Sequence, residues 1–210
     1  MPSYIYRYFN SIGFGEATRL LLTAAKVEWT EEFSEFGQGP LGHPDDYLPV
    51  LIQKNSDGSP DIVFNKFATI ERYLARTYGF LPANPEQVEL QEQLREKQAH
   101  VMVAFAIGMS APGVIRELLL IDFEKELEKL ISTYTELLRR NGNTGYSYGS
   151  TLSYADMVIY SFLKLVPIHF AMFSKALPKL VKGKMTPELA KLVTTVEADP
   201  LLVAYLSHRG

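Results

Sequence analysis

The stretch YIYRYFNSIGFGEATRLLL, residues 4–22, decides the fold of this chain. Its first residues place Tyr4, Tyr6 and Tyr8 at every second position, which is the period of a β-strand and uses residue types that strands favour. Two glycines follow, and apolar side chains then recur on one face of a helix over residues 13–25. The stretch predicts a strand, a short loop and a helix, with Tyr8 at the end of the strand.

The next sixty residues extend this pattern into a small domain. A second strand is predicted over 27–33, and a loop rich in Gly and Pro follows over 37–44. Two further strands, 50–53 and 61–64, flank the turn-forming cluster NSDGS. A helix is predicted over 66–78. The predicted order is β-α-β, a loop, and then β-β-α.

The segment LPANP, residues 81–85, interrupts the pattern with two prolines and predicts a stiff connector. We expect a domain boundary there, between residues 1–80 and a helical region over 86–210. Within that region Ser153 and Asp156 have the spacing of a capping box, in which each side chain accepts a hydrogen bond from the other residue's backbone amide.

Composition and charge exclude several kinds of function. The 210 residues carry 21 basic and 24 acidic side chains, so a net charge of −3 gives no electrostatic case for binding nucleic acid or an anionic membrane. The absence of cysteine excludes disulfides, thiolate metal ligands and a cysteine nucleophile. The four histidines are scattered, so no metal site is predicted. No basic and apolar leader begins the chain, and its most apolar run, Val101–Met109, is too short to span a bilayer.

Several segments together resemble the glutathione transferases, and most closely the sigma class among the tyrosine-type classes. They are YRYFNSIGFGEATRLLL at 6–22, LPVL at 48–51, IERYLA at 70–75, LSYAD at 152–156 and VEADPLLVAYL at 196–206. The resemblance covers essentially the whole chain. It implies an α+β protein: an N-terminal thioredoxin-like domain of βαβ-ββα order, followed by an all-α helical bundle.

The resemblance also implies a role for Tyr8, which matches the catalytic tyrosine of that family. The thiol of glutathione has a pKa of about 8.5, so only a few per cent is thiolate at neutral pH. A hydroxyl that donates a hydrogen bond to the sulfur favours the thiolate, which is the nucleophile. By the same resemblance the bond between Leu48 and Pro49 is expected to be cis, with the backbone of Leu48 facing the peptide of glutathione in strand fashion.

The sequence departs from the family where the charged ends of glutathione are normally held. Lys66 and Phe67 stand where the family has an acidic residue or glutamine followed by serine at a helix N-terminus. Ile12 and Phe14 stand where sigma-type members carry arginines. No aspartate occurs between Ile62 and Ile121 to serve a neighbouring subunit, which leaves two unaligned glutamates, Glu92 and Glu96, as candidates.

Two hypotheses follow. In the first, the protein is an enzyme that activates glutathione as co-substrate through Tyr8 and conjugates or isomerises a small apolar electrophile. In the second, the chain keeps the fold without the chemistry and serves as a ligand-binding, assembly or crystallin-like structural protein. The resemblance further implies a cytoplasmic homodimer that binds a small-molecule ligand, with no metal. The residues expected to contact the substrate, besides catalytic Tyr8, are Phe9, Phe14, Leu48, Pro49, Lys66 and Phe67.

Overall fold

The computed structural model of the chain describes residues 2–34, 48–165, 167 and 176–208. The chain divides into two compact units: Met1–Leu81 together with Glu197–Gly210, and Pro82–Val196. The C-terminal segment, which the sequence grouped with the helical region, thus belongs to the same unit as the opening strand. The predicted loop over 37–44 lies outside the described residues.

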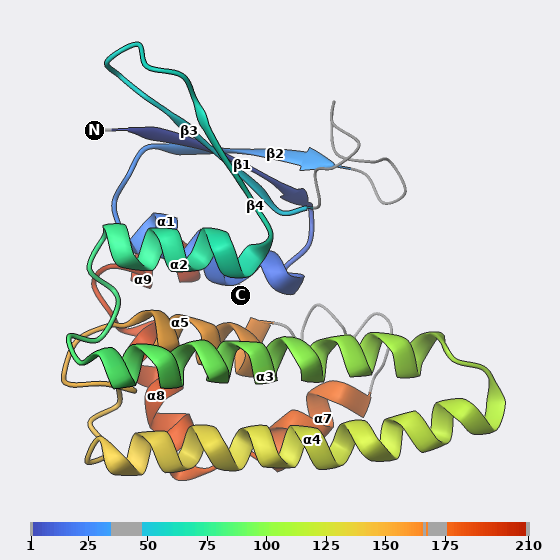
Figure 1. Cartoon of the computed structure of the whole chain (residues 1–210). Helices are drawn as coiled ribbons and strands as arrows, with labels where there is room; N and C mark the ends of the chain where they lie inside the picture. Colours follow the sequence, from blue (N-terminus) through green and yellow to red (C-terminus); the bar gives the residue numbers. More distant parts are fainter. Residues whose placement is uncertain (1, 35–47, 166, 168–175, 209–210) are drawn as a thin grey trace. The chain divides into compact units, whose positions relative to one another are not determined.

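The first unit contains a mixed four-stranded sheet in the order β2-β1-β3-β4 (Figure 1). β1 is parallel to β2 and antiparallel to β3, and β3 is antiparallel to β4. The predicted alternation along β1 is confirmed, because Tyr4, Tyr6 and Tyr8 are all buried. The strands are β1 (Ser3–Phe9), β2 (Trp29–Ser34), β3 (Val50–Lys54) and β4 (Ile62–Asn65).

Helices cover one face of this sheet (Figure 1). The predicted helix over 13–25 begins as a single 3₁₀ turn and becomes α-helical only at Glu16. Its leucines at positions 20–22 are fully buried. The helices of this unit are η1 (Gly13–Gly15), α1 (Glu16–Ala24), α2 (Phe67–Thr77) and α9 (Val203–Leu206). The thioredoxin-like order predicted from the sequence is therefore present.

The second unit is helical. Asn84 caps its first helix by accepting a hydrogen bond from the amide of Glu86 at 2.8 Å, and Pro85 occupies the first turn, where it needs no amide partner. Among the described residues, no helix is both long and apolar enough to cross a membrane. The helices are α3 (Pro85–Ser110), α4 (Gly113–Arg140), α5 (Tyr154–Tyr160), a π-helical turn η2 (Ser161–Leu165), α7 (Ala176–Gly183) and α8 (Pro187–Glu197).

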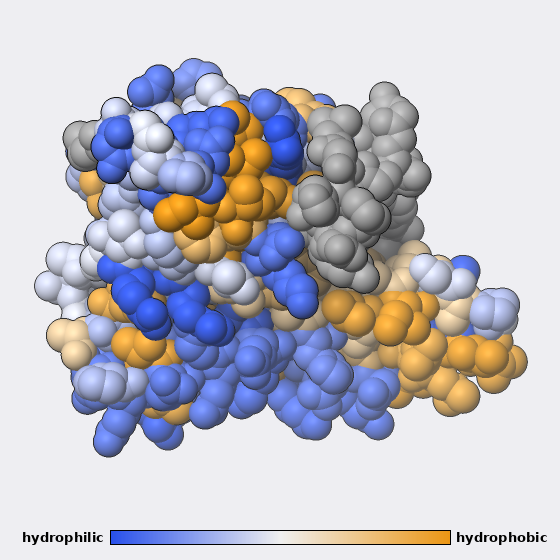
Figure 2. All heavy atoms as spheres, turned by 45° about the horizontal axis from the view of Figure 1, so that its top comes forward, coloured by the Kyte–Doolittle hydropathy of each residue, from blue (hydrophilic) through white to orange (hydrophobic). Residues whose placement is uncertain are grey.

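α3 and α4 form a long antiparallel hairpin (Figure 1). Aliphatic side chains stay exposed at its turn, where Figure 2 shows a continuous apolar area at the lower right. The turn is thus more apolar than the charged solvent face farther along the hairpin. Its exposed large side chains are Val103, Ile107, Val114, Ile115, Leu118 and Ile121.

The predicted capping box opens α5. The Oδ2 atom of Asp156 accepts hydrogen bonds from the amide of Ser153 at 2.8 Å and from its hydroxyl at 2.7 Å, and Oδ1 accepts from the amide of Ser147 at 2.6 Å. Asp156 is fully buried, and burial raises the pKa of its carboxyl to about 6 although these hydrogen bonds lower it. The box therefore joins the loop before α5 to the start of the helix.

This raised pKa predicts a pH-dependent stability. Between the ordinary pKa of 3.8 and about 6, the folded chain keeps a proton on Asp156 that the unfolded chain has released. The stabilisation from this group is complete below about pH 4 and is lost as the pH rises through about 6. It amounts to roughly 3 kcal/mol at most. The test is urea unfolding of the native chain and of Asp156→Asn between pH 4 and 7. As the pH rises, the unfolding free energy of the native chain should fall relative to that of the variant. Asp122→Asn, at an exposed position on α4, is the control. If the unfolding free energies of the native chain and of Asp156→Asn change with pH in the same way, the pKa assigned to Asp156 is contradicted.

Candidate functional site

Tyr8 is the second-to-last residue of β1, and its side chain lies on the helix-covered face of the sheet. It is 6% exposed, and its hydroxyl accepts a hydrogen bond from the amide of Phe14 at 3.3 Å, at the entrance to α1. The ring lies between Tyr6, with centroids 6.2 Å apart, and Phe9, at 5.3 Å. The opening stretch therefore places a hydroxyl at the start of a helix, where the N–H dipoles favour negative charge.

Gly15 makes this placement possible. A Cβ atom at this position would lie 2.4 Å from Cδ1 of Tyr8 and 2.9 Å from the hydroxyl of Tyr6. Such distances are far below van der Waals contact, so only glycine allows α1 to approach both rings.

Gly15→Ala is therefore expected to displace the Tyr8 ring and to destabilise the chain by roughly 1–3 kcal/mol. Thermal unfolding and the near-ultraviolet circular dichroism of the tyrosines measure the two effects. Gly183→Ala is the matched control, because a Cβ atom there meets nothing within 4 Å. Equal stability of the two variants would show that the Tyr6 and Tyr8 rings can shift to accommodate a Cβ atom at position 15.

An aromatic pair occupies the N-terminus of α2. Phe14 and Phe67 stack with centroids 4.9 Å apart and ring planes at 18°. Lys66, the N-cap of α2, directly precedes Phe67, is exposed, and makes no side-chain capping bond. Its φ of 66° is in the left-handed region, which costs a non-glycine residue about 1–2 kcal/mol. The structure thus brings Phe14 and Phe67 together where the sequence comparison expected polar groups.

The start of β3 lies beside the N-terminus of α2. The bond between Leu48 and Pro49 is cis, as expected, and the amide of Lys66 donates to the carbonyl of Pro49 at 3.2 Å. In the register of β1 with β3, Arg7 pairs with Val50, so Pro49 follows on toward Tyr8. The sheet therefore gathers the predicted contact residues at one end. Their roles toward a ligand stay predictions.

The sequence reasoning missed a buried ionic cluster beneath the Tyr8 ring. Arg19 is 1% exposed and pairs with Glu16 at 3.1 Å and with Glu31 at 2.5 Å. These contacts keep its pKa raised against the effect of burial. Its guanidinium carbon lies 5.6 Å from the ring centroid of Tyr6 and 5.7 Å from that of Tyr8. One signal was available: an arginine directly before three leucines on an apolar helix.

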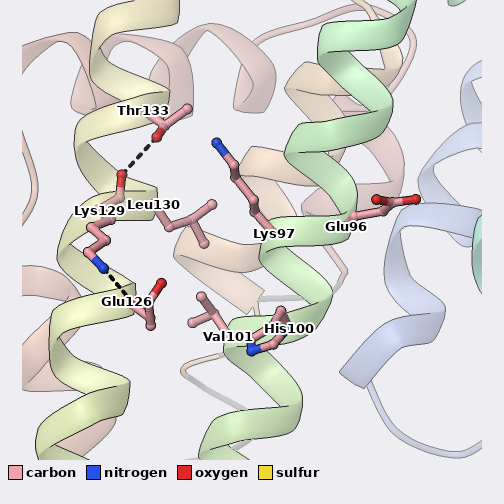
Figure 3. Close-up of a pocket in the computed structure, with 8 residues that line it drawn as sticks. All are labelled: Glu96, Lys97, His100, Val101, Glu126, Lys129, Leu130 and Thr133. Carbon is pink, nitrogen blue, oxygen red and sulfur yellow. Dashed lines mark hydrogen bonds and ion pairs between the residues drawn. The ribbon is translucent and has the colours of Figure 1, made fainter.

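The helical unit has a hollow of its own between α3 and α4, about 400 Å³ in volume (Figure 3). Its rim is charged, and Lys129 pairs with Glu126 across one turn of α4 at 2.6 Å. Of the two candidate glutamates, Glu96 lines this hollow, whereas none of the predicted contact residues does. The described residues contain no cluster of three His, Cys, Asp or Glu side chains placed to hold a metal ion. The lining residues are Glu96, Lys97, His100, Val101, Glu126, Lys129, Leu130 and Thr133.

The described residues thus form a thioredoxin-like unit with a tyrosine near the end of its first strand, and a helical unit. Residues 120–209 match the family described as glutathione S-transferase, C-terminal domain. Glutathione S-transferase 3 of Caenorhabditis elegans is 29% identical over 76% of this chain and 78% of its own length. S-crystallin SL11 of Nototodarus sloanii is 26% identical over 100% of this chain and 98% of its own.

Solved structures agree with these sequence matches. A glutathione S-transferase structure from Caenorhabditis elegans has a TM-score of 0.77 and 25% identity, with 100% of both chains covered. These similarities support a protein of the glutathione S-transferase family, near its sigma class. The fold class predicted from the sequence is thereby confirmed.

Proposed function

We propose that the protein is a glutathione S-transferase that adds the thiolate of glutathione to a small apolar electrophile, or isomerises one. In this proposal Tyr8 stabilises the thiolate, with no metal ion taking part. The observation that carries it is the position of the Tyr8 hydroxyl at the entrance to α1, where it accepts a hydrogen bond from the amide of Phe14. The match to the glutathione S-transferase C-terminal domain and the relatives named glutathione S-transferase support the same function.

The hydrogen bond from Phe14 matters for the chemistry. A hydroxyl oxygen that accepts one hydrogen bond polarises its own O–H, which becomes a better donor. A hydrogen bond from such a donor to a charged sulfur contributes roughly 1.5–3 kcal/mol, or about one to two units of the thiol pKa. That change makes the thiolate a major species at neutral pH, and the thiolate attacks the electrophilic carbon while the leaving group departs or the double bond accepts a proton.

The remaining contact residues take passive roles in this proposal. The backbone of Leu48, ahead of Pro49, pairs with the peptide backbone of glutathione as an added strand. Phe9 packs on the Tyr8 ring and keeps it in place. Lys66 offers a point charge to a carboxylate from the exposed N-cap of α2.

A second candidate function is a family member without the chemistry, and the stack of Phe14 on Phe67 favours it. A charged carboxylate placed against two apolar rings loses its hydration without gaining hydrogen bonds. Such a protein would serve as a ligand-binding, assembly or structural protein, and the similarity to S-crystallin SL11 is consistent with this role.

Calorimetric titration with glutathione, paired with a conjugation assay on a chloronitrobenzene, separates the two functions. The enzyme is expected to bind glutathione at millimolar concentration or below and to turn over. Binding of neither glutathione nor its S-alkyl conjugates, together with no turnover above the solution rate, would overturn the enzymatic proposal and support the second function.

We further propose that the protein is a cytoplasmic homodimer. Ile62 and Val63 support an association surface, because they leave apolar side chains exposed on the edge strand β4. Light scattering of the native chain and of Val63→Glu tests this. A monomer at all concentrations in both would contradict it.

A further inference from the structure

Arg19 places a full positive charge where water does not reach. Besides its contacts to the two glutamates, one terminal nitrogen donates to the carbonyl of Ser11 at 2.8 Å and the other to that of Phe9 at 3.2 Å. Those two carbonyls belong to the end of β1 and the loop that leads to Phe14. A single guanidinium therefore holds two carbonyls of the segment that leads to Phe14, whose amide donates to the Tyr8 hydroxyl.

The C-terminal segment reaches the same cluster. The hydroxyl of Tyr205, in α9, donates to Oε1 of Glu16 at 2.8 Å, while Oε2 of Glu16 accepts from Arg19. Glu16 is fully buried, so each of these hydrogen bonds offsets part of the free energy needed to desolvate its charge. The contacts form a chain from Tyr205 through Glu16 to Arg19 and on to the β1–α1 loop.

We propose that Arg19 is a positioning residue for the hydroxyl of Tyr8, and that Tyr205 keeps Arg19 in place through Glu16. The inference rests on the function proposed for Tyr8. Arg19 does not touch the substrate in this account. It acts by fixing the loop that carries the Phe14 amide and by keeping a positive charge within 5.7 Å of the centre of the Tyr8 ring.

The charges around the Tyr8 ring decide in which direction Arg19 changes the ionisation of the Tyr8 hydroxyl. The described contacts bring the cation of Arg19 to this cluster, together with carboxylates from three elements. Burial raises the pKa of the neighbouring Tyr6 hydroxyl, and Arg19 opposes that rise. Moving the cation away from the rings therefore disfavours negative charge on the Tyr8 oxygen and weakens it as a donor. The facing groups are Glu16 of α1, Glu31 of β2, Glu71 of α2, Tyr6 of β1 and Tyr205 of α9.

Arg19→Lys is the direct test. A lysine keeps the charge but lacks the planar fork that reaches two carboxylates and two carbonyls together. Arg7→Lys is the matched control, because Arg7 lies on β1 and pairs with Glu32 on the less buried face. Phenolate absorbance is titrated for each variant and for the same variant with Tyr8→Phe, and the difference isolates the ionisation of Tyr8.

Arg19→Lys is expected to raise the Tyr8 midpoint by about one pH unit. It should shift the pH profile of kcat/KM in the same direction and lower kcat about tenfold with little change in the KM for glutathione. Arg7→Lys should change none of these. An unchanged Tyr8 midpoint in folded Arg19→Lys would overturn the inference, even with lower stability, because a purely structural role predicts loss of stability alone.

Tyr205→Phe is the alternative test variant if Arg19→Lys does not fold. It removes one hydroxyl and keeps every charge, so a smaller rise of the Tyr8 midpoint and roughly a two- to threefold lower kcat are expected. Native-like values in both measurements would contradict the role of Tyr205. If the native chain neither binds nor conjugates glutathione, the enzymatic proposal fails by itself, and the Tyr8 midpoint still tests Arg19.

Discussion

Tyr8→Phe is expected to lower the rate of glutathione conjugation at neutral pH by roughly 10- to 100-fold. The variant loses the O–H donor to the thiolate, and one hydrogen bond to a charged atom is worth roughly 1.5–3 kcal/mol. Since the loss is a loss of thiolate, the deficit should shrink as the pH approaches the ordinary thiol pKa of about 8.5. Initial rates across that pH range, at saturating glutathione, measure the effect.

Tyr4→Phe is the matched control for this experiment. Tyr4 lies on the same strand and the same face, and its hydroxyl is 2.7 Å from that of Tyr78, away from the candidate site. It should alter stability and leave the rate unchanged. A Tyr8→Phe enzyme with the native rate at every pH would show that the Tyr8 hydroxyl does not stabilise the thiolate.

The double substitution Lys66→Gln with Phe67→Ser is expected to raise the affinity for glutathione by roughly 10- to 100-fold. It removes one ring of the Phe14–Phe67 stack and supplies a hydroxyl and an amide at the N-terminus of α2. Each charge-assisted hydrogen bond to the γ-glutamyl carboxylate contributes roughly 1.5–3 kcal/mol, and the free amides of the first helical turn assist. Isothermal titration calorimetry gives the dissociation constants.

Phe67→Leu separates steric relief from new hydrogen bonds. Leucine removes the ring and stays apolar, so its affinity should remain close to the native value if hydrogen bonding is what the site lacks. An affinity of the double variant no higher than that of the native chain would show that the aromatic pair does not obstruct the carboxylate position. The native chain would then hold glutathione through other residues.

Local sequence rules were enough for most of the secondary structure. The alternating tyrosines of β1 and the capping box of α5 were readable because strand periodicity and helix capping depend on residues a few positions apart. The start of α4 at Gly113 was less readable. Its first turns keep aliphatic side chains in solvent, so no buried face marks them in the sequence.

The candidate site also contains some features that the sequence predicted and others that it did not. Tyr8 and the cis bond before Pro49 were expected from their positions in matched segments. The stack of Phe14 on Phe67 joins residues more than fifty positions apart, and the sequence indicated only that each stands where a polar group was expected. Which ring fills which space depends on how the segments that carry them pack together in the fold.

By itself the sequence determined the order of strands and helices, the position of Tyr8 near a strand end and the resemblance to a family. Only the tertiary structure showed that Arg19, Glu16 and Tyr205 meet beneath that tyrosine, although 189 positions separate the last two. The physical reason is that a buried charge is tolerated only where its partners surround it. Those partners come from α1, β2 and α9, which the fold alone brings together.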